Sequence, residues 1–190
     1  VDNIFPHHEN EIAQSRCSAD SRFSNYWIHN EHLSVEGEKM SKSLGNFYTI
    51  RDLLNKGYKP EAIRYALISS HYRQKLNFTF NRLDDAQKSI NKIKELLRRL
   101  KSIKKENSND DETYKNFTAT FLNDFNVCIG DDLNISGSLG SFFIWINVLF
   151  KIIDQNKLSY SQSKDAIANI KKIDKILGVL GFDDNLDNDI

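Results

Sequence analysis

The chain has 190 residues, 39% of them hydrophobic, and its 26 Lys and Arg residues balance 26 Asp and Glu residues. This length allows one large or two small domains, and the apolar content is enough to build a core. No run approaches the ~20 uninterrupted apolar residues of a membrane-spanning helix, and no signal-peptide pattern opens the chain. Cys17 and Cys128 lack the spacing of a disulfide framework. We therefore expect a soluble, cytoplasmic protein with two free thiols.

Near the start of the chain, proline placement and side-chain type predict a helix and then a strand. Phe5-Pro6 precedes a run of good helix formers, and proline is favoured in the first turn of a helix. A helix here places His7 and Glu11 on one face. The residues from Tyr26 to Val35 are mostly β-prone, so we predict a short strand there and a turn at Glu36-Gly37-Glu38.

The middle of the chain has the pattern of helices. Two short helices are predicted from about Thr49 to Lys56 and from Pro60 to His71. A long amphipathic helix should follow, because apolar residues recur at intervals of three and four: Leu83, Ala86, Ile90, Ile93, Leu97, Leu100 and Ile103. The segment from Arg82 to Lys105 holds nine Lys and Arg against three Asp and Glu, so one face of this helix can attract phosphate groups.

The C-terminal part predicts a helical bundle. The run from Glu106 to Glu112 has no apolar residue and is typical of a linker. Three apolar patterns follow it: Phe117, Phe121 and Phe125; Leu139, Phe142, Ile146, Leu149 and Ile153; and Ala166, Ile170, Ile173, Leu177 and Leu180. Gly178 and Gly181 should end the last helix. Because each helix has one apolar stripe that needs a partner, we predict an antiparallel bundle and a mainly α fold.

The sharpest chemical pattern is the segment Lys39-Met40-Ser41-Lys42-Ser43. Two lysines three residues apart, with small hydroxyl residues and flanking glycines, can wrap a triphosphate and neutralise the charge that develops on departing pyrophosphate. On residue types alone, an ordinary exposed loop of Lys and Ser explains the segment more often than a phosphate site does.

The literal order of these five residues matches the second signature of the class I aminoacyl-tRNA synthetases without substitution. Four further segments resemble the cysteinyl-tRNA synthetase family in order and spacing: Phe5 to Ser15, Tyr26 to His29, Gly37 to Phe47 and His71 to Arg73. Asp131-Asp132-Leu133-Asn134 also resembles a motif of that family's helical domain. The resemblance extends over nearly the whole chain and is densest before residue 80.

This resemblance implies a domain order. Residues 1–50 would form the end of a class I Rossmann-type catalytic domain, residues 51–105 the stem-contact helices with the long basic helix, residues 106–182 a helical bundle, and residues 183–190 an acidic tail. The nucleotide domain with its His-Ile-Gly-His signature would lie upstream, since that signature is not in this sequence. The anticodon-binding region would lie downstream. We therefore expect the chain to be inactive alone.

His7 and Glu11 are the candidate metal ligands. An imidazole nitrogen and a carboxylate oxygen at this spacing can bind one zinc ion, but a surface hydrogen bond is the more common outcome, and His8 also lies within reach of Glu11. The resemblance selects His7 and Glu11, because the family uses these positions for the zinc ion that recognises the cysteine thiolate, a soft ligand that suits zinc. The other two ligands would be cysteines upstream. Cys17 lies roughly 15 Å from His7 along the helix axis and is a poor substitute.

The resemblance also implies a reaction. The intact protein would join L-cysteine to ATP, release pyrophosphate and transfer the cysteinyl group to the 3′ end of tRNA(Cys). Lys39 and Lys42 are the candidate catalytic residues, with Lys42 the better candidate for direct ATP contact. The ATP-binding residues implied are Lys39, Met40, Ser41, Lys42 and Ser43. Mg2+ would accompany the ATP.

Two other functions fit the sequence. A paralogous ligase would join cysteine to an amino sugar with the same zinc and lysine residues. A noncatalytic RNA-binding helical module would use basic residues of the long helix, although a solvated helix face explains these equally well: Lys88, Lys92, Arg98, Arg99 and Lys101. The sequence pattern places no second catalytic group beside His29, His32 or His71, so we expect packed or hydrogen-bonded histidines there.

Overall fold

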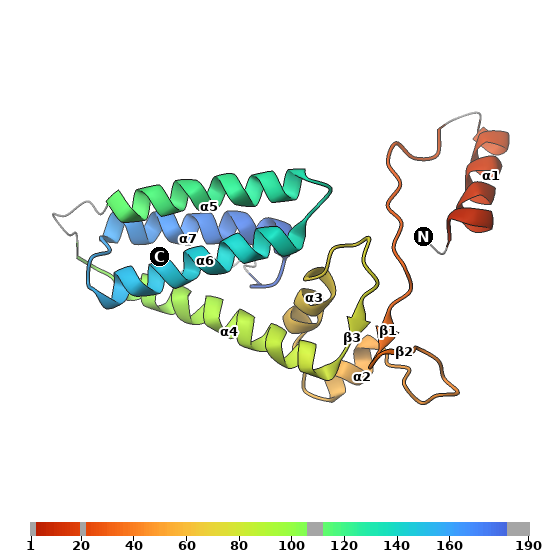
Figure 1. The fold of residues 1–190 in the computed structure, drawn as a ribbon, viewed down its shortest axis with the longest axis horizontal. Helices are drawn as coiled ribbons and strands as arrows, with labels where there is room; N and C mark the ends of the chain where they lie inside the picture. Colours follow the sequence, from red (N-terminus) through yellow and green to blue (C-terminus); the bar gives the residue numbers. More distant parts are fainter. Residues whose placement is uncertain (1–2, 20–21, 106–111, 182–190) are drawn as a thin grey trace. The chain divides into compact units, whose positions relative to one another are not determined.

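The computed structural model describes residues 3–19, 22–105 and 112–181. Within these ranges the fold is mainly α, as the sequence predicts (Figure 1). The elements in chain order are η1 (Ile4–His8), α1 (Glu9–Ala19), β1 (Ser34–Val35), β2 (Glu38–Lys39), α2 (Ile50–Asn55), α3 (Pro60–Ile68), β3 (Asn77–Phe78), α4 (Phe80–Ser102), α5 (Glu112–Gly130), α6 (Ile135–Asp154) and α7 (Tyr160–Leu177). The expected acidic tail and all but the last residue of the expected linker lie outside the described residues.

The chain forms two compact units, each of which is discontinuous in sequence. The first unit consists of residues 1–47 and 70–79, and the second of residues 48–69 and 80–190. The lysine segment belongs to the first unit, whereas the long basic helix α4 belongs to the second.

A three-stranded sheet with the order β2-β1-β3 organises part of the first unit. β1 pairs antiparallel with β2 and parallel with β3, with Ser34 opposite Lys39 on one side and Asn77 on the other. The β1–β2 turn is the predicted one, and its residues Glu36 and Gly37 have φ values of 50° and 84°. Both values are positive, as in the two-residue turns whose twist suits a hairpin. β2 therefore leads directly into the lysine segment.

The strand predicted from Tyr26 to Val35 is wrong for most of its length. Only Ser34 and Val35 pair with other strands, and the residues before them have no regular structure. Tyr26 is 88% exposed and Ile28 is 57% exposed. β-propensity reports how well a side chain fits a half-buried pleated surface, and no such surface covers these side chains within the described residues.

The predicted N-terminal helix is present but begins later than Pro6. A π-helical turn, η1, precedes α1, and Phe5 inside that turn has extended backbone angles. α1 has no buried residue. With no buried side chain, α1 gains little stability from packing, and an isolated helix of this length is only marginally stable in water.

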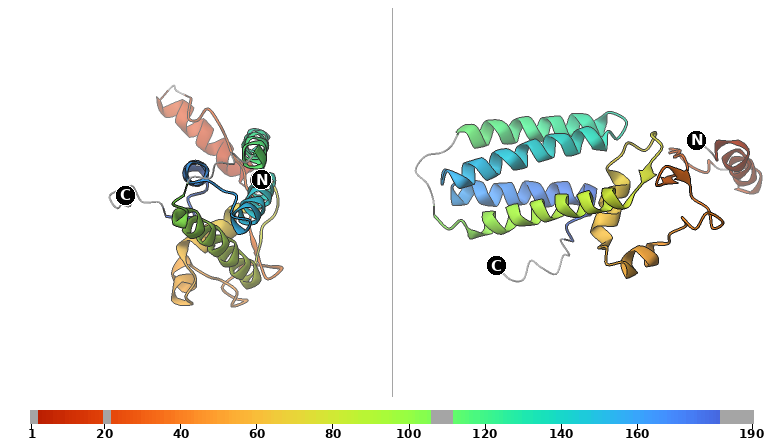
Figure 2. Two further views of the ribbon diagram at one scale, coloured as in Figure 1. Left: turned by 90° about the vertical axis from the view of Figure 1, so that its left-hand side faces the viewer. Right: turned by 60° about the horizontal axis from the view of Figure 1, so that its bottom comes forward.

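The helices α4 to α7 lie side by side in the second unit and form the predicted bundle (Figures 1 and 2). Short connections make α5 and α6, and then α6 and α7, antiparallel. The stripe predicted on α4 is buried from Leu83 to Leu100. Phe121 stacks on Trp145 with ring centroids 4.5 Å apart at the centre of the bundle. Phe117, predicted on the same stripe as Phe121, is instead 43% exposed.

By length and composition alone, α6 could cross a membrane, the one such helix in the part of the chain that the structure describes. In the bundle it packs as a core helix. Four of its large apolar side chains, Phe142, Trp145, Ile146 and Leu149, are at most 1% exposed, whereas Ile144 is 62% exposed. Burial against the neighbouring helices therefore accounts for one face of α6.

The C-terminus of α7 is fastened by three side-chain and backbone features. Gly178 ends the helix in the left-handed conformation, as predicted. The buried Asp174 carboxylate accepts hydrogen bonds from the backbone N–H groups of Val179 (2.8 Å) and Leu180 (3.1 Å). Arg64 Nε on α3 donates a 2.6 Å hydrogen bond to the Leu177 carbonyl. The end of α7 is thereby tied to α3.

Candidate functional site

The lysine loop, defined as residues 39–46, leaves strand β2 and is closed by hydrogen bonds within itself. The backbone N–H of Ser41 donates to Asn46 Oδ1 at 2.8 Å, and Asn46 Nδ2 donates to the Lys39 carbonyl at 3.1 Å. The Gly45 N–H donates to the Lys42 carbonyl at 3.2 Å, and Gly45 has a φ of 66°, a conformation that glycine adopts without strain. The loop therefore has a defined backbone path.

The predicted phosphate-binding side chains lie along this path. The hydroxyl oxygens of Ser41 and Ser43 are 3.1 Å apart, and Ser41 Oγ accepts a 3.2 Å hydrogen bond from the Leu44 N–H. Lys42 Nζ lies 5.5 Å from the centroid of the Phe47 ring, a cation–π contact. Among the described residues, neither Lys39 nor Lys42 has a carboxylate partner, and both are exposed. Two un-neutralised ammonium groups on one short loop suit binding of a polyphosphate.

The structure brings His7 and Glu11 together on the first turns of the N-terminal helix. His7 Nε2 lies 3.3 Å from Glu11 Oε1, and their side chains are 64% and 39% exposed. Two ligands of a tetrahedral zinc ion with bonds of ~2.1 Å would be separated by ~3.4 Å, so this spacing fits one edge of such a site. No group of three or more potential ligands occurs among the described His, Cys, Asp and Glu residues. The pair fits half of a tetrahedral zinc site.

His8 has a different partner, which sequence reasoning missed. Its Nδ1 lies 3.1 Å from Nδ1 of His29, and the two rings share a hydrogen bond. Trp27 stacks on His29 with an interplanar angle of 8°. Spacing alone leaves His7 and His8 equivalent toward Glu11, whereas the structure directs His8 toward the segment that contains Trp27. His71, as expected, is packed and hydrogen-bonded: it stacks on Tyr72 and accepts a hydrogen bond from the Arg73 N–H.

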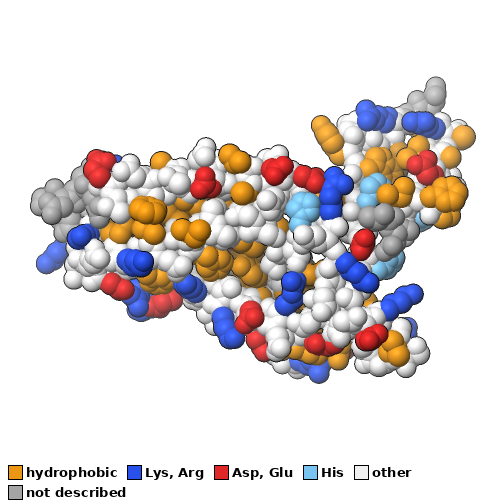
Figure 3. Space-filling view, in the orientation of Figure 1, with side chains coloured by type: hydrophobic (Ala, Val, Ile, Leu, Met, Phe, Trp, Pro, Cys, Tyr) orange, Lys and Arg blue, Asp and Glu red, His pale blue; other side chains and the backbone are white. Residues whose placement is uncertain are grey.

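The basic face of α4 is largely paired within the protein. Four of its five candidate side chains have polar partners: Lys88 with Asp85, Lys92 with Asn147, Arg98 with Glu95, and Arg99 with both Glu95 and Asp154. Hydrogen bonds from Arg98 and Arg99 lower the pKa of Glu95 to about 2. Figure 3 shows acidic side chains among the basic ones along this edge of the bundle. Asp85 and Glu95 already enter the sequence count, and Asp154 adds one further negative charge beside this face, so the net positive charge available to an RNA backbone is modestly smaller than that count indicates.

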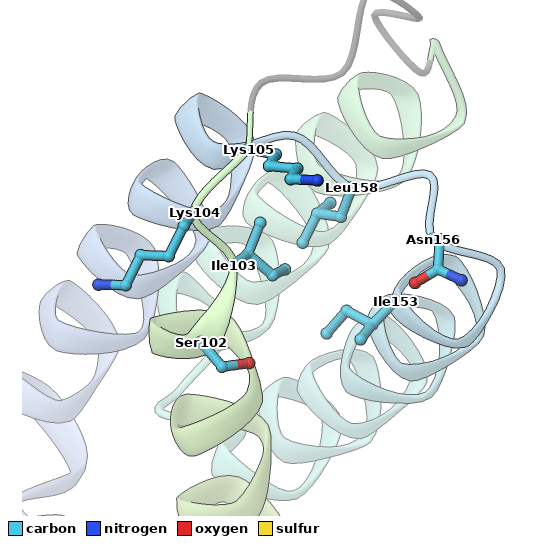
Figure 4. Close-up of a pocket in the computed structure, with 7 residues that line it drawn as sticks. All are labelled: Ser102, Ile103, Lys104, Lys105, Ile153, Asn156 and Leu158. Carbon is cyan, nitrogen blue, oxygen red and sulfur yellow. The ribbon is translucent and has the colours of Figure 1, made fainter.

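A pocket of about 440 Å³ lies at the C-terminal end of α4 (Figure 4). It is lined by Ser102, Ile103, Lys104, Lys105, Ile153, Asn156 and Leu158. Ile103 and Leu158 approach each other at its wall, whereas the Lys104 side chain extends away. Among the described residues, its ionisable lining groups are Lys104 and Lys105. The sequence did not predict this pocket, and its described lining lacks a paired acid and base of different types.

Comparison with known proteins finds a matching family. Residues 1–88 match the sequence model of the class I (C) catalytic domain of tRNA synthetases. This part of the chain therefore has the sequence pattern of a class I tRNA synthetase catalytic domain. The chain's relationship to cysteine–tRNA ligases extends well beyond that domain, as the predicted resemblance requires.

Three relatives illustrate the extent of this similarity. The cysteine–tRNA ligase of Chlamydia abortus is 44% identical over 187 residues, which are 98% of this chain and 39% of the relative. That of Brachyspira hyodysenteriae is 45% identical over 97% of this chain and 39% of its own length. That of Leptospira interrogans is 42% identical over 100% of this chain and 42% of its own length. The chain thus spans about two fifths of the length of these synthetases.

Proposed function

We propose that this chain is the lysine-loop part of a cytoplasmic cysteine–tRNA ligase, which activates L-cysteine with ATP and transfers the cysteinyl group to the 3′ end of tRNA(Cys). The observation that carries this proposal is identity of 42–45% to cysteine–tRNA ligases over nearly the whole chain. The exposed, un-neutralised lysines of the lysine loop support it, because the reaction requires binding and release of a polyphosphate.

In this proposal Lys42 binds the phosphate groups of ATP directly. Its ammonium leaves the Phe47 ring and neutralises the negative charge that develops as pyrophosphate departs. Because this charge is greatest in the transition state, Lys42 stabilises the transition state more than bound ATP. Lys39 supplies a second positive charge at the start of the loop. Met40, Ser41 and Ser43 shape the loop, and the two hydroxyls add donors for phosphate oxygens. Mg2+ accompanies the ATP as part of the substrate.

His7 and Glu11 would hold a zinc ion together with two ligands from outside this chain. Bound there, zinc would serve as a Lewis acid that takes the thiolate of cysteine and so selects this substrate. The contribution of this chain is orientation. Glu11 faces His7 Nε2, and the contact of His8 with His29 fastens the adjacent backbone. Both ligand side chains remain partly exposed and accessible to a metal ion.

Activity would require the rest of the polypeptide found in the longer relatives. The first unit exposes several large apolar side chains to an unusual degree: Phe5 (79%), Phe23 (54%), Tyr26 (88%) and Ile28 (57%). An exposed apolar group of this kind is typical of a surface that another part of a protein covers. The alternative of a noncatalytic RNA-binding module is less favoured, because the α4 basic side chains are mostly paired.

The test is cysteine-dependent ATP–pyrophosphate exchange, measured for this chain and for a polypeptide extended to the length of the relatives. We expect exchange only in the extended polypeptide. Lys42→Ala should lower its rate by about 100-fold or more, the usual effect of removing one transition-state donor. Lys56→Ala is a matched control, because Lys56 also lies over aromatic rings but outside the lysine loop.

Three results would contradict parts of the proposal. Exchange by the short chain alone would refute its dependence on the missing portion. Transfer of the activated cysteine to an amino sugar, rather than to tRNA, with release of AMP, would identify the paralogous ligase. Absence of exchange in both polypeptides, together with RNA binding, would favour the noncatalytic module.

A further inference from the structure

The side-chain amide of Asn46 spans the whole lysine loop. Its oxygen accepts the Ser41 N–H at 2.8 Å, and its nitrogen donates to the Lys39 carbonyl at 3.1 Å. These partners precede Asn46 by five and seven residues. A single planar group therefore joins the end of the loop to its beginning and to its first turn.

This arrangement needs both halves of an amide. A carboxylate could accept from Ser41 but would place its second oxygen against the Lys39 carbonyl, and an apolar side chain could make neither bond. The two partners also determine the orientation of the amide, since a flipped group would place donor against donor and acceptor against acceptor. The residue type at position 46 thus follows from the hydrogen bonds of the loop.

Lys42 lies in the middle of the segment that Asn46 closes. Two hydrogen bonds between residues closer in sequence restrict this segment further. The Gly45 N–H donates to the Lys42 carbonyl, and the Leu44 N–H donates to Ser41 Oγ. A ligand that binds an open, flexible loop must order that loop, which reduces affinity. A loop that is already closed has less conformational entropy to lose when it binds phosphate.

We propose that Asn46 is a positioning residue, whose amide holds the lysine loop in a conformation that binds polyphosphate through Lys42. This inference rests on the proposed function of the lysine loop, and it assigns Asn46 to holding the loop backbone rather than to the reaction itself. It predicts that loss of the amide loosens the loop backbone and weakens polyphosphate binding together.

Amide hydrogen exchange of the whole 190-residue chain, followed by NMR, measures the first effect. Asn46→Ala should accelerate exchange of the Ser41 N–H by about tenfold, because its acceptor is removed. Asn55→Ala is the matched control: Asn55 is an exposed asparagine at the end of α2, outside the loop. It should leave Ser41 exchange unchanged. Equal Ser41 exchange rates in the unaltered chain and in Asn46→Ala would overturn the proposal.

Titration with inorganic tripolyphosphate measures the second effect, with the loop resonances as the signal. We expect Asn46→Ala to weaken binding about fivefold, Lys42→Ala to abolish it and Asn55→Ala to leave it unchanged. Equal affinities of the unaltered chain and Asn46→Ala would overturn the positioning role, and so would failure of the unaltered chain to bind tripolyphosphate. The proposed ligase function fails separately, through absence of cysteine-dependent exchange in the extended polypeptide.

Discussion

The indole Nε1 of Trp145 donates a 3.0 Å hydrogen bond to the hydroxyl of Thr118, and both side chains are buried in the bundle. Thr118→Val keeps the shape but leaves the indole N–H without its acceptor, which should lower the free energy of unfolding by about 1–3 kcal/mol. Thr118→Ser keeps the hydroxyl acceptor, so it should lower the free energy of unfolding by less than Thr118→Val does. Urea unfolding monitored by circular dichroism measures both. Equal stability of Thr118→Val and the unaltered protein would show that this bond does not stabilise the bundle.

The lowered pKa of Glu95 predicts how the free energy of unfolding changes at acid pH. Hydrogen bonds from Arg98 and then Arg99 lower its pKa from 4.5 to about 2. Because the folded-state pKa is the lower one, this contribution is fully present above the ordinary pKa and is lost as pH falls from about 4.5 to about 2. Glu95→Gln should therefore flatten the stability profile across that window, and added salt should reduce the difference between the two proteins.

The matched control for Glu95 is Glu112→Gln. Glu112 makes a looser exposed ion pair with Lys115, at 4.0 Å. Denaturant midpoints measured from pH 6 to pH 2 compare the variants. An unchanged acid profile in Glu95→Gln would mean that its arginine contacts do not persist in solution.

Zinc titration of this chain should perturb the NMR signals of the His7 ring before those of the His71 ring, because His7 Nε2 lies 3.3 Å from Glu11 Oε1, a spacing that suits a shared metal ion. His7→Ala should weaken zinc binding at least about tenfold, since it removes one of two ligands. His71→Ala should not, and a chelator should reverse the perturbation. Histidine ring signals in NMR spectra provide the measurement. Perturbation of His8 and His29 in preference to His7 would contradict the assignment.

The bundle could be predicted because helix periodicity records burial directly. The α4 stripe from Leu83 to Leu100 is buried in the structure, and Gly178 ends α7 where the sequence indicates. The segment from Tyr26 to Leu33 shows the limit of such reasoning. Its side chains have β propensity, but strand formation also needs a neighbouring strand, which sequence pattern alone cannot supply.

The candidate site was predictable only in part, for a similar reason. The spacing of His7 and Glu11 placed them on one face, but the partner of His8 is 21 residues away, at a distance where periodicity carries no information. The pairing of the α4 charges could have been found. Asp85 and Lys88 are three residues apart, a spacing that brings helix side chains together. The metal and ATP roles of the site residues stay predictions.

The hydrogen bond between Arg64 and Leu177 joins positions that are 113 residues apart. A ribosome that adds about 5–20 residues per second needs roughly 6–23 seconds to travel that distance, so α3 emerges long before its partner at the end of α7 exists. During this interval α3 can already pack on α4, which follows it closely in the chain. The apolar surface of the α3–α4 pair that α7 covers in the finished protein stays exposed until then, and we expect chaperone binding to be concentrated at this stage of synthesis.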